Sequence, residues 1–253
     1  MENARSRQQL RATMRLRELV VAGAFTPGER ISELAAVDML GMSRTPVRLA
    51  LGALAHEGLL ERLPSGGFIV RDYSISDIYD AIELRGVLEG TAARMAAERS
   101  SGKKSTVKLR AILAMIDTLI EQDPRDDDVY ERYVELNAEF HEELLRLAKC
   151  PLLERSLAQV TALPFASANA FVKVQANRPR SKDVLIHAQH QHIALVDAIE
   201  AGESARALSL GQEHARLAAR NLTEVMKQDE LFNRVPGAQL IRRQKDQEPA
   251  RAN

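Results

Sequence analysis

Apolar residues recur at helical spacing over most of the chain. The exception lies within the first seventy residues, where a strand pattern follows the helical one. There, three periodic stretches are separated by turn-forming residues and are followed by two short β-prone runs. The pattern predicts helices over residues 8–22, 33–40 and 44–57, and strands over 59–63 and 68–70. Three helices followed by a two-stranded hairpin indicate a winged helix-turn-helix, which places one helix in the major groove of DNA.

From about residue 74 the periodic stretches become longer, and they predict helices alone. They lie near residues 75–99, 105–122, 128–148, 151–173, 182–201 and 203–227. The longest interior break, 176–182, contains proline. Six helices with short connections favour an antiparallel bundle.

The chain is therefore predicted to be mainly α and to have three parts. Residues 1–73 form the winged helix-turn-helix domain, and residues 74–230 form an all-α antiparallel six-helix bundle. Residues 231–253 are polar and basic, and we expect this tail to be flexible.

Charge is distributed unevenly although the chain carries 35 basic and 35 acidic residues. Residues 1–73 contain ten arginines, eight acids and no lysine, whereas the middle of the chain is acidic. Such a distribution is expected when the head alone contacts phosphate. The single cysteine and the lack of a long apolar run predict a cytoplasmic protein that does not enter a membrane.

The predicted third helix has a polar face that suits DNA. Ser43 is placed to cap it, and Arg44 and Arg48 share one face with Thr45 beside them. Guanidinium groups there can bind guanine edges or phosphates, and the hydroxyls can bind backbone oxygens. The alternative is an exposed helix whose arginines serve solubility, but the hairpin that follows favours DNA binding.

The first helix carries arginines at every fourth position, Arg7, Arg11 and Arg15. This basic face either lies along phosphates or is simply solvated, and its spacing fits both interpretations.

Four polar residues on three predicted bundle helices have the chemistry of a metal site. Asn137 and His141 are four residues apart, and His192 and His214 lie among apolar residues on the last two helices. Three imidazoles and an amide oxygen suit Zn²⁺ or a similar divalent ion. The alternative is that each histidine is a hydrogen-bonded core residue.

The head is similar to a known family. The segments Phe25–Ala35, Leu40–Arg48 and Leu54–Val70 closely resemble the N-terminal domain of GntR-family transcription regulators. This resemblance implies that the operator is contacted by Ser43, Arg44, Thr45 and Arg48, and by the wing tip at Ser65, Gly66 and Gly67. The wing tip lacks the basic residue that is frequent in the family, so we expect it to make backbone contacts only.

Residues 77–228 resemble the FCD effector-binding domain of the FadR subfamily, and the six bundle helices fit its VanR-like group. The resemblance rests on Glu83–Gly90, Asn137–His141, His192–Ile199 and His214. It implies a divalent metal held by Asn137, His141, His192 and His214, with Zn²⁺ expected and Ni²⁺ or Mn²⁺ as alternatives. Asn137 stands where Asp is frequent, which leaves the site more positive and more attractive to an anion.

A small organic acid is the effector that this resemblance implies, with its carboxylate on the open metal positions. Arg85 would bind the same carboxylate, although an ordinary intrahelical pair with Glu89 explains the spacing equally well. We therefore expect a homodimeric regulator that binds double-stranded DNA at an inverted-repeat operator.

A metal-dependent hydrolase with an attached DNA- or partner-binding domain is the alternative function. It would need a general base at the open metal position, and the chain contains no His-Glu-x-x-His run, phosphate loop or Gly-x-Ser-x-Gly elbow. We therefore expect that the protein is not an enzyme.

Overall fold

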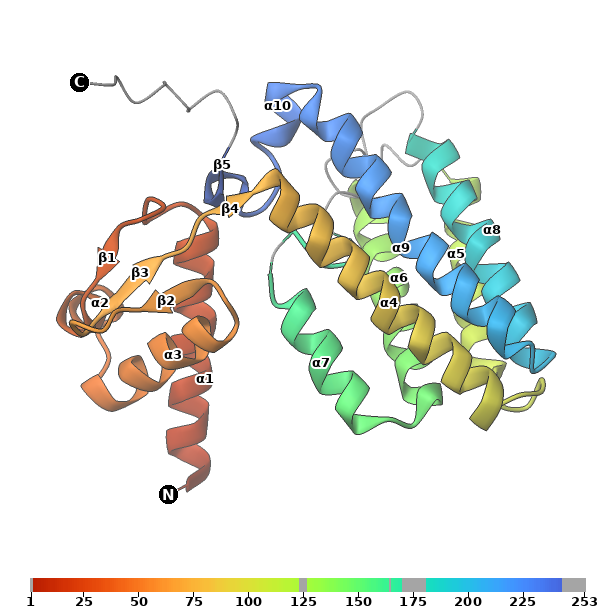
Figure 1. The fold of residues 1–253 in the computed structure, drawn as a ribbon, viewed down its shortest axis with the longest axis horizontal. Coiled ribbons are helices and arrows are strands. Elements are labelled where there is room, and N and C mark those ends of the chain that lie inside the picture. The colour runs from red at the N-terminus through yellow and green to blue at the C-terminus, as the bar shows by residue number, and fades with distance from the viewer. Residues whose placement is uncertain (1, 123–126, 164, 170–180, 243–253) are drawn as a thin grey trace. The chain divides into compact units, whose positions relative to one another are not determined.

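The computed structural model describes residues 2–122, 127–163, 165–169 and 181–242, which fold into two compact units (Figure 1). The head unit contains the chain up to Ile78, a short segment at 162–163 and the C-terminal segment from Pro236. The helical unit contains residues from Tyr79 to Thr161 and from Phe165 to Val235.

The head unit is a winged helix-turn-helix, as predicted. Its elements are α1 (Glu2–Val21), β1 (Arg30–Ile31), α2 (Glu33–Leu40), α3 (Arg44–His56), β2 (Leu60–Arg62), β3 (Phe68–Val70) and β4 (Tyr73–Ser74). The first three strands form an antiparallel sheet in the order β1-β3-β2, in which β2 and β3 are the wing. Helix α1 begins at Glu2 rather than near residue 8, because the polar residues before Gln8 continue the helix instead of capping it.

Local chemistry explains the ends of the helices in the head. The Ser32 hydroxyl accepts a hydrogen bond from the Ala35 N–H at 3.1 Å and caps α2. Gly41 follows α2 with a φ of 61°, a left-handed conformation that glycine adopts without strain. Between α1 and the end of α3, Arg17 forms a forked pair with Glu57, with Nη2 donating to Oε1 at 2.7 Å.

The helical unit contains, among its described residues, the six predicted helices and one short additional helix. They are α4 (Ile75–Arg99, which begins in the head unit), α5 (Val107–Glu121), α6 (Asp127–Ala148), α7 (Pro151–Thr161), α8 (Ser181–Glu200), α9 (Ser204–Met226) and α10 (Asp229–Phe232). The prediction that the fourth bundle helix reaches residue 173 is wrong, because α7 ends at Thr161. Most of the predicted 176–182 loop lies outside the described residues.

The core of this unit is built from the inward faces of α5, α6 and α8 around the fully buried Phe140. Helices α4 and α9 meet more closely, at glycines. A Cβ on Gly90 would lie 2.7 Å from the carbonyl oxygen of Leu208, so the two backbones are in contact. This contact brings the turn of α4 that carries Arg85 and Glu89 next to the turn of α9 that carries His214. A hydrogen bond from Arg85 to the Ala215 carbonyl joins the two turns.

The part of the chain that follows α9 is folded up to Arg242. It contains α10, a 3₁₀ turn (Ala238–Leu240) and β5 (Ile241–Arg242), which pairs in parallel with β4. Phe232, Leu240 and Ile241 are buried. The prediction of a flexible tail from residue 231 is therefore wrong for residues 231–242, because the apolar residues scattered among the polar and basic ones are buried. Residues 243–253 lie outside the described residues.

Across the residues that the structure describes, the helices are too short or too polar to span a lipid bilayer.

Candidate metal centre and DNA-recognition face

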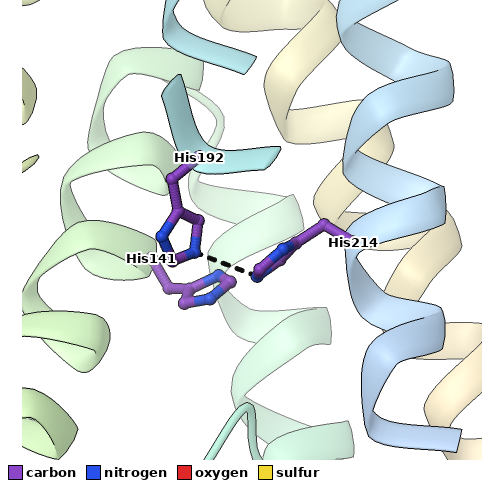
Figure 2. A group of neighbouring side chains, drawn as sticks. All are labelled: His141, His192 and His214. Atoms are coloured by element: carbon purple, nitrogen blue, oxygen red, sulfur yellow. Dashed lines mark hydrogen bonds between the residues drawn. The ribbon is translucent and has the colours of Figure 1, made fainter. Parts of the chain in front are cut away.

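Three histidines from three helices converge inside the helical unit. His141 of α6, His192 of α8 and His214 of α9 turn their rings toward one another, as Figure 2 shows. One ring nitrogen from each residue lies within 4.8 Å of the others, and the Nε2 atoms of His192 and His214 are 3.0 Å apart. The sequence placed these residues on separate helices, and the fold brings them together.

The ring nitrogens of this cluster have few partners within the protein. Nε2 of His141 and Nδ1 of His192 are buried without a hydrogen-bond partner among the described residues. Nδ1 of His141 lies 3.3 Å from the Glu89 carboxylate, and His214 Nδ1 lies 3.1 Å from Gln191 Oε1. Buried polar atoms are almost always satisfied in folded proteins, so orphaned imidazole nitrogens indicate a missing partner. A tetrahedral zinc ion bound at about 2.0–2.1 Å separates its nitrogen ligands by roughly 3.4 Å, which lies between the 3.0 Å separation of the two Nε2 atoms and the 4.8 Å limit of the group.

Electrostatics also favour the neutral imidazoles that a metal requires. Burial lowers the pKa of His192 well below its usual value, with the neighbouring His214 and His141 acting in the same direction. Burial, followed by the proximity of His141, lowers the pKa of His214 to about 3. Both rings are therefore neutral at physiological pH, which leaves a ring nitrogen lone pair available for an ion.

Asn137, the predicted fourth ligand, is buried on α6 one turn before His141. Its Nδ2 donates to Asn169 Oδ1 at 2.8 Å, and Asn169 Nδ2 donates to the Val134 carbonyl at 3.0 Å. These bonds fix the amide and make its Oδ1 oxygen the atom that could bind an ion. Asn137 also lines a cavity of about 30 Å³ together with Arg85 and His214.

Arg85, the predicted effector contact, is a buried cation on the wall of this cavity. Its Nη2 donates to the Ala215 carbonyl at 3.2 Å, whereas Nε and Nη1 have no hydrogen-bond partner among the described residues. The ion pair with Glu89 is long, at 3.9 Å between Nε and Oε2. The intrahelical pair therefore exists, but it leaves two donor atoms of the guanidinium unsatisfied.

Glu89 is a residue of the site that the sequence interpretation placed in an ordinary ion pair. It is buried, and its Oε1 lies 3.3 Å from His141 Nδ1. Burial alone would raise the pKa of Glu89, but the proximity of His141 and Arg85 lowers it to about 2. The carboxylate is therefore ionised. No spacing rule connects Glu89 with His141, because their contact depends on how α4 packs against α6.

The predicted DNA contacts on α3 lie on one accessible face of the head unit. Ser43, Arg44, Thr45 and Arg48 are exposed, whereas Pro46 and Val47 are buried. Ser43 occupies the N-cap position without a side-chain capping hydrogen bond. This arrangement allows the N-terminal turn of α3 to present two guanidinium groups and two hydroxyls to DNA.

Further basic residues flank this face. Arg11 is exposed on α1 and lines a hollow of about 510 Å³ with Arg7 and Arg15. At the exposed wing tip, Arg30 of β1 donates to the Gly66 carbonyl at 2.7 Å. The sequence interpretation missed Arg30, because the pairing of β1 with β3 that carries it to the wing involves only two residues. The wing therefore has a cation beside Ser65, Gly66 and Gly67.

Each of the two units matches a known protein family. Residues 8–70 match the bacterial regulatory proteins of the gntR family, and residues 80–217 match the FCD domain. The chain belongs to the GntR family, with an FCD domain as its helical unit. Like other members of that family, this GntR protein is a DNA-binding transcriptional regulator and not an enzyme, so the hydrolase alternative is not supported.

Individual relatives agree with this assignment. The Nta operon transcriptional regulator of Aminobacter aminovorans is 32% identical over 199 residues, which cover 78% of this chain and 87% of the relative. The probable D-xylose utilization operon transcriptional repressor of Paenarthrobacter nicotinovorans is 28% identical over 73% of this chain and 75% of its own length. The solved structure of E. coli McbR/YncC has the same fold, with a TM-score of 0.59 at 20% identity, covering 87% of this chain and 97% of that one.

Proposed function

We propose that this GntR regulator is a cytoplasmic homodimer that binds an inverted-repeat operator and senses a small carboxylate at a divalent metal ion. Residues 1–73 would read the operator and residues 74–230 would bind the effector. Zinc suits a set of three imidazoles and an amide oxygen best, with nickel or manganese as alternatives.

The observation that carries the proposal is the position of Arg85 beside the histidines. The cavity that Arg85 lines also contains His214 and Asn137, and two donor atoms of its guanidinium lack partners among the described residues. A bound divalent ion would supply a Lewis-acidic centre with open positions for carboxylate oxygens. Arg85 would then donate to the same carboxylate and fix its orientation.

The response requires only a modest coupling between the effector and DNA. A coupling free energy of about 1–3 kcal/mol changes affinity roughly 5- to 150-fold, which is enough to alter operator occupancy. A carboxylate bound between α4, α6 and α9 would change how these helices pack, and α4 begins directly after the head at Ile75.

Two measurements test the proposal. Metal analysis of the purified protein should give one equivalent of divalent ion per chain, which His192→Ala combined with His214→Ala should abolish. His187→Ala combined with His190→Ala is the matched control, because both residues are exposed on the same helix as His192. Metal content in the double variant equal to wild type would exclude the site.

The effector class is tested by a thermal-shift screen of small carboxylates with Zn²⁺ and after chelation. We expect a carboxylate to raise the melting temperature of the metal-loaded protein only, and Arg85→Gln to remove that shift. A carboxylate that stabilises the chelated protein equally well would show that the metal has no role in sensing. Light scattering of the free and DNA-bound protein tests the dimer.

A further inference from the structure

Glu89 lies between the candidate metal centre and the candidate anion contact. Its Oε1 is 3.3 Å from His141 Nδ1, and its Oε2 is 3.9 Å from Arg85 Nε. The side chain is only 6% exposed, and Oε2 has no hydrogen-bond partner among the described residues. Burying a carboxylate costs free energy unless cations or hydrogen-bond donors surround it. His141 and Arg85 are the two neighbours that offset this cost for Glu89.

The contact with Glu89 distinguishes the two nitrogens of His141. Nδ1 faces the carboxylate, so Nε2 is the atom left for an ion. In metalloproteins a ligating histidine usually donates its other N–H to a carboxylate or carbonyl, which fixes the ring orientation and raises its basicity. The Glu89 oxygens are not part of the group formed by the three imidazoles, whose ligand atoms all lie within 4.8 Å of one another. Glu89 therefore contacts His141 without being one of the proposed metal ligands.

The charge of the site supports the same role. Asn137 carries no charge at the position where an aspartate would have supplied a negative one. Among the residues lining the described cavity, Arg85 adds a positive charge. A divalent cation among these groups needs a nearby negative charge to offset it, and Glu89 is the buried carboxylate in contact with one of the imidazoles.

We propose that Glu89 is the positioning residue of the metal centre, which holds His141 with Nδ1 protonated and Nε2 toward the ion and supplies the negative charge that Asn137 lacks. This assignment rests on the proposed metal site. It adds to that site a residue outside the ligand set and a defined histidine tautomer.

The first test compares Glu89→Gln with wild type in a zinc competition titration against a chromophoric chelator. We expect the zinc dissociation constant of Glu89→Gln to rise about 10- to 100-fold, because outer partners of metal ligands have effects of that size. Glu83→Gln is the matched control. Glu83 also lies on α4 and pairs with Arg216 of α9, but its side chain is 57% exposed. Its zinc affinity should stay within twofold of wild type.

The second test needs no variant at the site and decides the assignment if Glu89→Gln fails to fold. Nitrogen-15 NMR of the zinc-loaded wild-type protein should show His141 protonated at Nδ1 and coordinated through Nε2. Coordination through Nδ1, or an affinity of Glu89→Gln within twofold of wild type, would overturn the role of Glu89 alone. A wild-type protein that binds no divalent ion would overturn the metal centre itself and the role of Glu89 with it.

Discussion

Gly90 of α4 and Gly211 of α9 touch backbone to backbone. A Cβ on Gly211 would lie 2.8 Å from the Gly90 Cα, which is closer than real Cβ contacts come, and 3.1 Å from the Gly90 nitrogen. The crossing at these glycines lets α4 approach α9 closely enough for Arg85 to reach the Ala215 carbonyl. The proposed effector site therefore depends on two residues that contribute no side chain to it.

Gly211→Ala should destabilise the protein, because the added methyl group meets backbone that cannot move independently of the helices. We expect a loss of about 1–3 kcal/mol in the free energy of unfolding, measured by urea denaturation. Gly52→Ala is the control, since Gly52 lies within α3 with nothing within 4 Å of its added Cβ. Gly52→Ala should raise the free energy of unfolding by roughly 0.5–1 kcal/mol, because alanine favours a helix more than glycine does. Equal effects in the two variants would contradict close packing at Gly211.

Arg44→Ala and Arg48→Ala should each weaken operator binding by about 1–3 kcal/mol if the arginine reads a base edge. Fluorescence anisotropy at fixed salt measures this change. Arg94→Ala is the control, because Arg94 is an exposed arginine of the helical unit that pairs with Glu98. Operator affinity that is unchanged in both α3 variants would show that this face of α3 does not contact DNA.

The Glu200 carboxylate should make stability depend on pH in acid. Hydrogen bonds from the Arg110 guanidinium and from Thr106 lower the pKa of Glu200 to about 2. A depressed pKa in the folded state contributes stability above the unfolded value, near 4.3, and this contribution is lost as pH falls toward 2. Arg110→Ala should therefore reduce the free energy of unfolding on the order of 1 kcal/mol at pH 6.

That deficit should shrink as pH falls from 5 to 2, because protonated Glu200 no longer gains from Arg110. Arg206→Ala provides the control, since its pair with Glu203 is exposed and should have little effect at any pH. A deficit for Arg110→Ala that stays constant across this range would show that Arg110 acts through packing and not through charge.

The C-terminal segment should stabilise the head unit. Leu240 is fully buried, and the Gln239 side chain donates to the last carbonyls of α1 at Val20 and Val21. Leu240→Ala should cost about 2–5 kcal/mol and increase hydrogen exchange in α1. Deletion of residues 243–253 is the comparison and should leave α1 protected. Unchanged exchange in Leu240→Ala would show that the segment is not part of the head.

Residue pattern alone identified the elements that local chemistry controls. The range of α2, the polar face of α3 and the helical spacing of the bundle are properties of neighbouring residues, so they can be read along the chain. The fold class follows from their order. The ends of α1 and α7 were misjudged because helix termini depend on weak local preferences, which tertiary packing easily overrides.

Contacts between distant segments were decided only by the tertiary structure. The sequence indicated that His141, His192 and His214 lie on apolar-rich helices, but their convergence depends on how α6, α8 and α9 pack. The same packing makes Glu89, which pairs with Arg85 on its own helix, a neighbour of His141 as well. It also folded residues 231–242, whose few apolar side chains form no periodic pattern and are nevertheless buried. Periodicity reports which face of an element is buried, whereas the partner of that face is set by the whole fold.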